Sequence, residues 1–132
     1  MSKYRALIAG HGDFAAGIVS AAVQITGRDD VFASLSNRGL SAADVAAAMG
    51  RILDESGARV VFTDLPAGSC TMAARRLQRD RSGLVVVVGV NLATLLDFIF
   101  DDADDVAAAR QAATKGREAL TVLGDPGVAR GA

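Results

Sequence analysis

Four aliphatic stretches alternate with segments of helical periodicity along almost the whole chain. The expected strands are residues 4–9, 31–35, 59–63 and 84–90, and only one glycine interrupts the aliphatic run of the last. A strand that is apolar on both faces is typical of a parallel sheet covered by helices on each side. The alternation therefore predicts an α/β fold, in which crossover helices join parallel strands.

Two helices are expected between the first three strands. The first carries an apolar stripe that begins at Phe14. The second begins at Ser41, whose hydroxyl can cap it, and Asp44 supplies the acidic partner three residues later. A helical spacing of apolar residues follows, and Gly57 ends this helix.

Three further helices are expected in the second half of the chain. The third runs from a cap at Ser69 to about residue 79, with Met72 on its inner face. The fourth starts near Asn91 and has Phe100 on its apolar side. The acidic run at residues 101–105 precedes the fifth, a placement that the helix dipole favours, so we interpret these aspartates as helix-start residues rather than metal ligands.

Length and charge predict one globular domain that does not bind nucleic acid. The chain has 132 residues, of which 51% are hydrophobic, and 14 Lys and Arg are interspersed with 15 Asp and Glu, so no basic stripe follows a phosphate backbone. We expect this domain to span residues 1–123 and residues 124–132 to form a flexible tail. Residues 119–123 could add a short edge strand.

Cysteine content and hydropathy favour a cytoplasmic location. Cys70 is the single cysteine and cannot form an intrachain disulfide, and the N-terminus lacks the pattern of a secretory signal. The longest aliphatic run is far shorter than the roughly 20 residues that span a bilayer.

The expected strand order brings two polar residues together. The commonest short doubly wound sheet has the order 2-1-3-4, and reacting groups gather at the carboxyl ends of its strands 1 and 3. His11 follows the first expected strand and Asp64 follows the third. Since adjacent strands lie about 4.8 Å apart, the sequence predicts a His11–Asp64 pair within hydrogen-bonding reach.

Such a pair has a definite chemical use. Asp64 can accept a hydrogen bond from one ring N–H of His11, which leaves the lone pair of the other nitrogen free as a nucleophile. Gly10 and Gly12 allow a close approach to the imidazole, and the helix start at Ser69 offers amide donors to an anion. A phosphoryl group carried on the histidine would suit this arrangement.

Position alone leaves other interpretations of these residues open. A histidine that closes a turn and an aspartate that caps a helix are common structural features. The glycines around His11 also resemble the start of a dinucleotide fingerprint, with Ala15 at the third-glycine position. However, no acidic residue ends the second strand, as that fingerprint requires.

Three segments carry a resemblance to a known family. Residues 8–18 read IAGHGDFAAGI, residues 61–70 read VFTDLPAGSC and residues 88–96 read VGVNLATLL. They resemble the phosphorylation-site motif, the Asp-containing loop and the entry to the fourth helix of the mannose-type enzyme IIA domains of the bacterial phosphoenolpyruvate:sugar phosphotransferase system. The resemblance covers nearly the whole chain.

This resemblance implies a phosphocarrier of sugar uptake with no metal or cofactor of its own. His11 would take a phosphoryl group from phospho-HPr and pass it to a IIB component, and Asp64 would orient it. Gly12, Gly68 and Ser69 would contact the phosphoryl group. The resemblance also implies a homodimer, in which the short C-terminal strand pairs with the partner's sheet, and an indirect association with the membrane components IIC and IID.

The loop after Asp64 departs from the family pattern. Pro66, Ala67 and Cys70 are unusual there, and Ala67 would be strained if the backbone has a positive φ at that position. These departures leave the shape of the loop open. We interpret Cys70 as a small, passive residue in the first turn of a helix.

Three related functions compete with this interpretation. Phosphotransfer subunits of dihydroxyacetone kinases look like relatives of this fold, but they often have serine where this chain has Gly12. Within the sugar-transport family, the motifs around His11 and Asp64 favour amino-sugar systems. A response-regulator receiver would be phosphorylated on Asp64, but it needs an acidic pair after the first strand to hold magnesium, and residues 10–12 read GHG instead, which excludes this interpretation. A regulatory protein could use a phosphorylated His11 without sugar transport, and the sequence does not distinguish regulation from transport.

Overall fold

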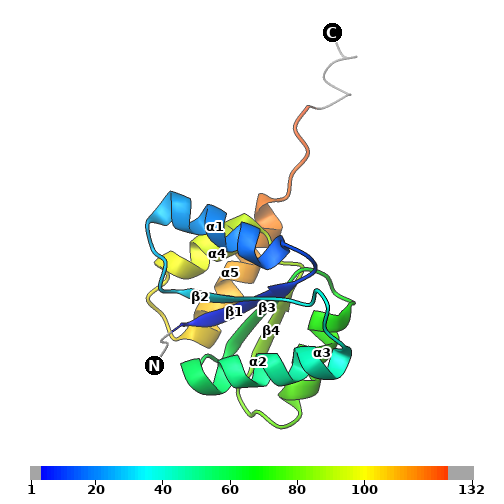
Figure 1. Cartoon of the computed structure of the whole chain (residues 1–132). Coiled ribbons are helices and arrows are strands. Elements are labelled where there is room, and N and C mark those ends of the chain that lie inside the picture. Colours follow the sequence, from blue (N-terminus) through cyan, green and yellow to red (C-terminus); the bar gives the residue numbers. More distant parts are fainter. Residues whose placement is uncertain (1–3, 125–132) are drawn as a thin grey trace.

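Four parallel strands form one sheet in the order β2-β1-β3-β4, as predicted. The structure, a computed structural model, describes residues 4–124 (Figure 1). Along the chain, its elements are β1 (Ala6–Gly10), α1 (Phe14–Thr26), β2 (Phe32–Ser36), α2 (Ala42–Ser56), β3 (Val60–Thr63), α3 (Ser69–Gln78), β4 (Val85–Val88), α4 (Leu92–Phe100) and α5 (Asp105–Ala119). The predicted alternation is thus confirmed.

Helices cover both faces of the sheet. Helices α1, α4 and α5 lie on one face, and α2 and α3 lie on the other (Figure 1). All five residues of β1 are buried. Because successive side chains of a strand point to opposite faces, Ile8 packs into the core under α1, α4 and α5, while Leu7 packs against α2 and α3.

The aliphatic run at residues 84–90 is less buried than its composition predicts. Strand β4 lies at the edge of the sheet, where residues 85–87 are partly exposed and Val88 is 42% exposed. Leu84 and Val90, which flank the strand, are buried. Composition therefore identified a parallel strand correctly but overestimated its burial, because the fourth strand of the predicted order lies at the edge of the sheet.

The edge strand expected at residues 119–123 does not form in this chain. Ala119 ends α5, and residues 120–124 have no regular structure. This segment leads away from the sheet (Figure 1), so it has no neighbouring strand with which to make a ladder. The side chains of Leu120, Val122 and Leu123 are exposed as a result.

Two helix caps agree with the sequence prediction and one does not. The hydroxyl of Ser41 accepts a hydrogen bond from the N–H of Asp44, 3.1 Å away, and the side chain of Asn91 caps α4. Ser69 does not cap α3, since it is the first helical residue and Gly68 occupies the cap position. The prediction was wrong by one residue because only glycine suits the φ of 122° at the cap.

Two apolar side chains assigned to inner helix faces are exposed. Met72 lies on the outer side of α3, which packs inward through small residues such as Ala73 and Ala74. Phe100 is exposed at the end of α4. In both helices the buried face is rotated from the predicted one, because contacts with the sheet, rather than hydropathy, select it.

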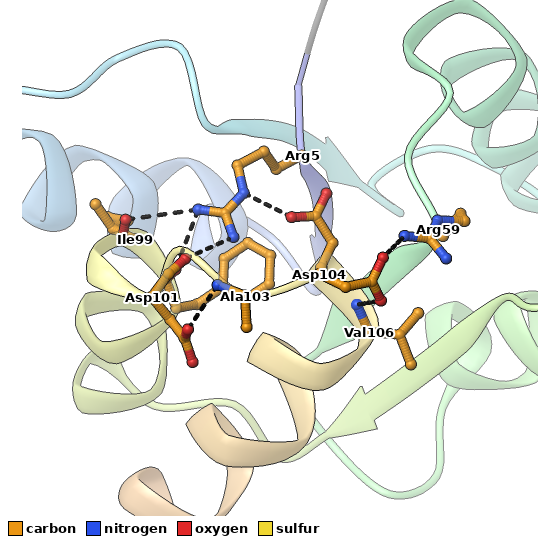
Figure 2. A network of polar contacts seen from close by, with 9 residues as sticks. Arg5, Arg59, Ile99, Asp101, Ala103, Asp104 and Val106 are labelled. Atoms are coloured by element: carbon orange, nitrogen blue, oxygen red, sulfur yellow. Dashed lines mark hydrogen bonds and ion pairs between the residues drawn. The ribbon is translucent and has the colours of Figure 1, made fainter.

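Arg5 ties the end of α4 to the start of α5 (Figure 2). Its guanidinium lies 4.2 Å from the ring centroid of Phe98 and donates hydrogen bonds to the backbone oxygens of Phe98 and Asp101. Its Nε also donates to Asp105, 2.8 Å away. The cation thus binds carbonyl groups at the C-terminal end of α4, where the helix dipole favours a positive charge.

Helices α4 and α5 are in close contact at Gly116. A Cβ atom at this glycine would lie 1.9 Å from Oγ1 of Thr94 and 3.0 Å from Oδ1 of Asn91. The side-chain amide of Asn91 donates a hydrogen bond to the backbone oxygen of Gly116, 2.8 Å away. The absence of a side chain at Gly116 therefore allows this contact.

We expect Gly116→Ala to destabilise the protein by about 1–3 kcal/mol, because the methyl group overpacks the α4–α5 contact. Urea unfolding followed by circular dichroism measures this change. Gly17→Ala is the matched control, since Gly17 is an exposed glycine in α1 with no atom within 4 Å of the added Cβ. The control should gain up to about 1 kcal/mol. Equal loss in both variants would contradict the packing argument.

Candidate functional site

His11 and Asp64 meet at the carboxyl ends of the two central strands. In the parallel pairing of β1 with β3, Ala9 lies opposite Thr63, so the residues that follow both strands leave the sheet at the same level. The ring Nδ1 of His11 lies 2.8 Å from Oδ2 of Asp64. The structure thus brings these two residues together as the strand order predicts.

One carboxylate oxygen of Asp64 holds both the backbone and the ring of His11. Besides the contact with Nδ1, Oδ2 accepts a hydrogen bond from the backbone N–H of His11 at 2.9 Å. The two contacts fix the position of the residue and the plane of its ring. The side chain of Asp64 is 10% exposed, whereas that of His11 is 50% exposed. The largely buried carboxylate therefore holds one side of the imidazole, and the rest of the ring is accessible to an incoming group.

The state of Asp64 determines which ring nitrogen is nucleophilic. Burial acts to raise the pKa of Asp64, but the hydrogen bonds from the backbone and ring of His11 outweigh it and hold the pKa below its usual value. The ionised carboxylate accepts hydrogen bonds and donates none. Nδ1 of His11 therefore carries the proton in the neutral ring, and the lone pair of Nε2 is free.

Glycines on both sides of His11 make room for this pair. A Cβ atom at Gly10 would lie 2.8 Å from Cδ2 of Phe14 and 3.0 Å from Oδ2 of Asp64. Gly12 has a φ of 53°, in the left-handed region that favours glycine. A side chain at Gly10 would displace the carboxylate that holds His11.

The start of α3 lies beside the free nitrogen of His11. A Cβ atom built on Gly68, the cap residue, would lie 3.0 Å from Cε1 and 3.7 Å from Nε2 of the ring. Ser69 is the first residue of the helix. The first N–H groups of an α-helix have no partner within the helix and attract anions. An anion beside Nε2 would therefore lie close to Gly68 and to the first N–H groups of α3.

The unusual loop residues cause no backbone strain. Within residues 4–124, every residue with a positive φ is a glycine, so Ala67 is unstrained and Gly68 takes the φ of 122°. The buried hydroxyl of Thr71 contacts the backbone oxygen of Leu65 and, at 2.7 Å, the hydroxyl of Thr63. These contacts hold the loop onto the end of β3.

Cys70 is buried in the core between the sheet and α3. Burial raises the pKa of its thiol, and the nearby negative charge of Asp64 acts in the same direction. A thiol with these properties is a poor nucleophile at neutral pH. The prediction of a passive residue fits this position.

Residues at the end of β2 also face the site, and the sequence analysis missed them. The side-chain amide of Asn37 donates a hydrogen bond to the hydroxyl of Ser69, 2.8 Å away. Arg38 forms an ion pair with Asp13 on the far side of the His11 turn, with 3.1 Å between Nη1 and Oδ1. The predicted position of strand 2 beside strand 1 was the signal that could have identified both residues.

Two general features complete the description of residues 4–124. This part of the chain holds no cluster of three or more His, Cys, Asp or Glu side chains suited to a metal ion. None of its helices combines the length and the apolar character needed to cross a membrane.

Solved structures similar to this chain include several IIA components. The mannose/sorbose-specific IIA subunit from Enterococcus faecalis has a TM-score of 0.80 at 23% identity, covering 94% of this chain and 97% of that one. The component EIIA from Streptococcus agalactiae has a TM-score of 0.76 at 24% identity, with coverage of 92% and 97%. The PTS IIA protein associated with the fucose utilization operon of Streptococcus pneumoniae has a TM-score of 0.79 at 22% identity, with coverage of 93% and 96%.

At these identities the structural likeness shows a common fold. No curated protein sequence matches the chain. The sequence model of the family EIIA-man, described as the PTS system fructose IIA component, matches residues 5–115, a region that includes His11, Asp64 and all nine helices and strands but for the last residues of α5. The chain therefore belongs to the EIIA-man family of phosphotransferase-system IIA components.

Proposed function

We propose that this protein is a phosphocarrier that accepts a phosphoryl group from phospho-HPr on Nε2 of His11 and passes it to a IIB component. The family supports a role in the phosphotransferase system. The observation that carries the proposal is the double contact of Asp64 with His11, which leaves Nε2 free beside the start of α3.

In the proposed step, the lone pair of Nε2 attacks the phosphorus atom as the N–P bond of the donor histidine breaks. The donor nitrogen takes back the electron pair of that bond, and the proton on Nδ1 of His11 stays in place. The ring of His11 gains positive charge as the new bond forms. The carboxylate of Asp64, 2.8 Å from Nδ1, stabilises this charge.

The negative oxygens of the phosphoryl group would be bound from the other side. The N–H groups at the start of α3, at Ser69 and the residues after it, directly follow Gly68, whose Cβ position lies 3.7 Å from Nε2. Gly12 lets the backbone on the opposite side approach the ring without a side chain in the way. Transfer to the IIB component is the same step in reverse.

Transport and regulation share this chemistry. In transport, the IIB component would pass the phosphoryl group to a sugar, in association with the membrane components IIC and IID. The sequence motifs favour an amino sugar. In regulation, a partner would read the phosphorylated state of His11 without sugar uptake. We place the carrier in the cytoplasm and favour transport, because the family whose model matches the chain is described as a PTS system fructose IIA component.

Incubation with phosphoenolpyruvate, enzyme I and HPr should add one phosphoryl group to the wild-type protein and none to His11→Ala. Intact mass spectrometry under non-acidic conditions, which preserve phosphohistidine, measures the gain. A IIB transfer assay then tests whether the group moves onward. An unlabelled wild-type protein, with a control IIA that labels, would refute the proposed function.

Asp64→Asn should slow phosphoryl transfer to His11 by roughly 10²–10⁴-fold. The asparagine amide can donate to Nδ1, which favours a proton on Nε2 and removes the nucleophilic lone pair. Rapid-quench measurement of the transfer rate from phospho-HPr tests this expectation. Asp54→Asn is the control, since the carboxylate of Asp54 in α2 pairs with Arg81 instead of His11. A wild-type rate for Asp64→Asn would contradict the assigned role.

The proposal includes a homodimer formed through the C-terminal segment. The edge of β4 is open, and a hollow of about 250 Å³ beside it is lined by Val87, Val88, Arg117 and Leu120, among others. The exposed side chains of Leu120 and Val122 follow directly after α5. If this apolar segment pairs with the β4 edge of a second copy, it covers the open edge of the sheet and buries its own exposed side chains.

Light scattering coupled to size-exclusion chromatography should give the mass of two chains for the wild type and of one chain for Val122→Asp. The charge would have to be buried in the paired segment. Ile25→Ser, which removes an exposed apolar side chain at the end of α1, is the control and should remain dimeric. A monomeric wild type would refute this part of the proposal.

A further inference from the structure

Asn37 joins two of the segments that surround His11. It follows β2, and its backbone N–H donates a hydrogen bond to the backbone oxygen of Gly10, 3.1 Å away, at the end of β1. Its side-chain amide Nδ2 donates to the hydroxyl oxygen of Ser69, 2.8 Å away, at the start of α3. Asn37 is partly buried, as is Ser69. One residue thus links the strand that ends before His11 to the helix that faces its Nε2.

The direction of the Asn37–Ser69 hydrogen bond determines what the serine hydroxyl can do. A hydroxyl group has one hydrogen to donate and two lone pairs that accept. Nδ2 of Asn37 occupies one lone pair, so the hydroxyl hydrogen of Ser69 is directed elsewhere. Ser69 does not cap α3, and besides Asn37 its side chain contacts the thiol of Cys70, which is a weaker hydrogen-bond acceptor than a phosphoryl oxygen. The hydrogen therefore remains available to an anion beside the helix start.

The segment that carries Asn37 is held on both sides. The hydroxyl of Ser36 accepts a hydrogen bond from the backbone N–H of Arg38 at 3.1 Å, and the guanidinium of Arg38 pairs with Asp13. A Cβ atom on Gly12 would lie 3.3 Å from Nη2 of Arg38. The connection after β2 is thus placed against the His11 turn, which limits the positions open to Asn37.

We propose that Asn37 is a positioning residue for phosphoryl transfer, which orients the Ser69 hydroxyl as a hydrogen-bond donor to the phosphoryl group on His11. This inference rests on the proposed function. In the transfer step, the Nε2–P bond forms and the donor's N–P bond breaks, while the Ser69 hydroxyl keeps its proton and donates to a phosphoryl oxygen whose negative charge it stabilises. Asn37 acts only through Ser69.

The test compares transfer rates from phospho-HPr for Asn37→Ala, Ser69→Ala and the double variant. Asn37→Ala should lower kcat about tenfold, the effect of one hydrogen bond of ordinary strength, with KM for phospho-HPr unchanged. In the Ser69→Ala background, Asn37→Ala should have no further effect, because the two side chains form one unit. An additional tenfold loss in the double variant would overturn the inference, since Asn37 would then act independently of Ser69.

Asn37→Asp separates orientation from packing. The aspartate has nearly the same shape but accepts hydrogen bonds, so the Ser69 hydroxyl would turn toward it and away from the phosphoryl group. We expect this variant to be slower than Asn37→Ala, and a rate equal to the wild type would overturn the inference. Ser34→Ala is the control, because Ser34 has an exposed side chain within β2, three residues before Asn37; its rate should stay within about twofold of the wild type.

A measurement on the unphosphorylated protein distinguishes failure of this inference from failure of the proposed function. In ¹H–¹⁵N NMR spectra, Ser69→Ala should shift the side-chain amide signals of Asn37, and Ser34→Ala should leave them in place. Unshifted signals would overturn the inference whatever the enzymatic result. If Ser69→Ala shifts the Asn37 signals but the wild-type protein takes no phosphoryl group from phospho-HPr, the proposed function is refuted and, with it, the role assigned to Asn37.

Discussion

The parallel pairing of β1 with β3 is the constraint on which the site depends. It places Ala9 opposite Thr63, so that the chain leaves both strands at one level and Asp64 lies beneath His11. A shift of one residue in this register would turn every side chain of the strand to the opposite face. The pairing is held by the two cores on either side of the sheet, because Leu7 and Ile8 of β1 are buried in different cores. Packing energy far from the site thus sets its geometry.

Close packing determines which residues can surround the imidazole. Gly10 and Gly68 each lie so near the His11–Asp64 pair that a Cβ atom would approach a neighbouring atom within 3.0 Å. The glycines let backbone groups take positions that side chains would otherwise fill. Binding of an anion by backbone N–H groups requires this closeness, since hydrogen bonds weaken beyond about 3.2 Å. The same principle explains Gly116, where the absence of a side chain lets two helices touch.

Periodicity and motif positions predicted much of the fold. The alternation of aliphatic and helical segments identified the helices and strands, and the commonest strand order proved correct. The errors concern the burial of one strand and the rotation of two helices. The most aliphatic run became the exposed edge strand β4, and Met72 faces outward on α3. Hydropathy measures how readily a segment is buried, but which side is buried depends on the elements that pack against it.

The sequence by itself determined the fold class and the meeting of His11 with Asp64, because both follow from strands that must lie side by side in a parallel sheet. Only the tertiary structure decided the finer arrangement. It assigned the cap of α3 to Gly68, and it brought Asn37 to Ser69 across a separation of 32 residues. Contacts of this kind depend on the angle of one side chain against another element. Neither periodicity nor composition records that angle, since it is set by how the whole core packs.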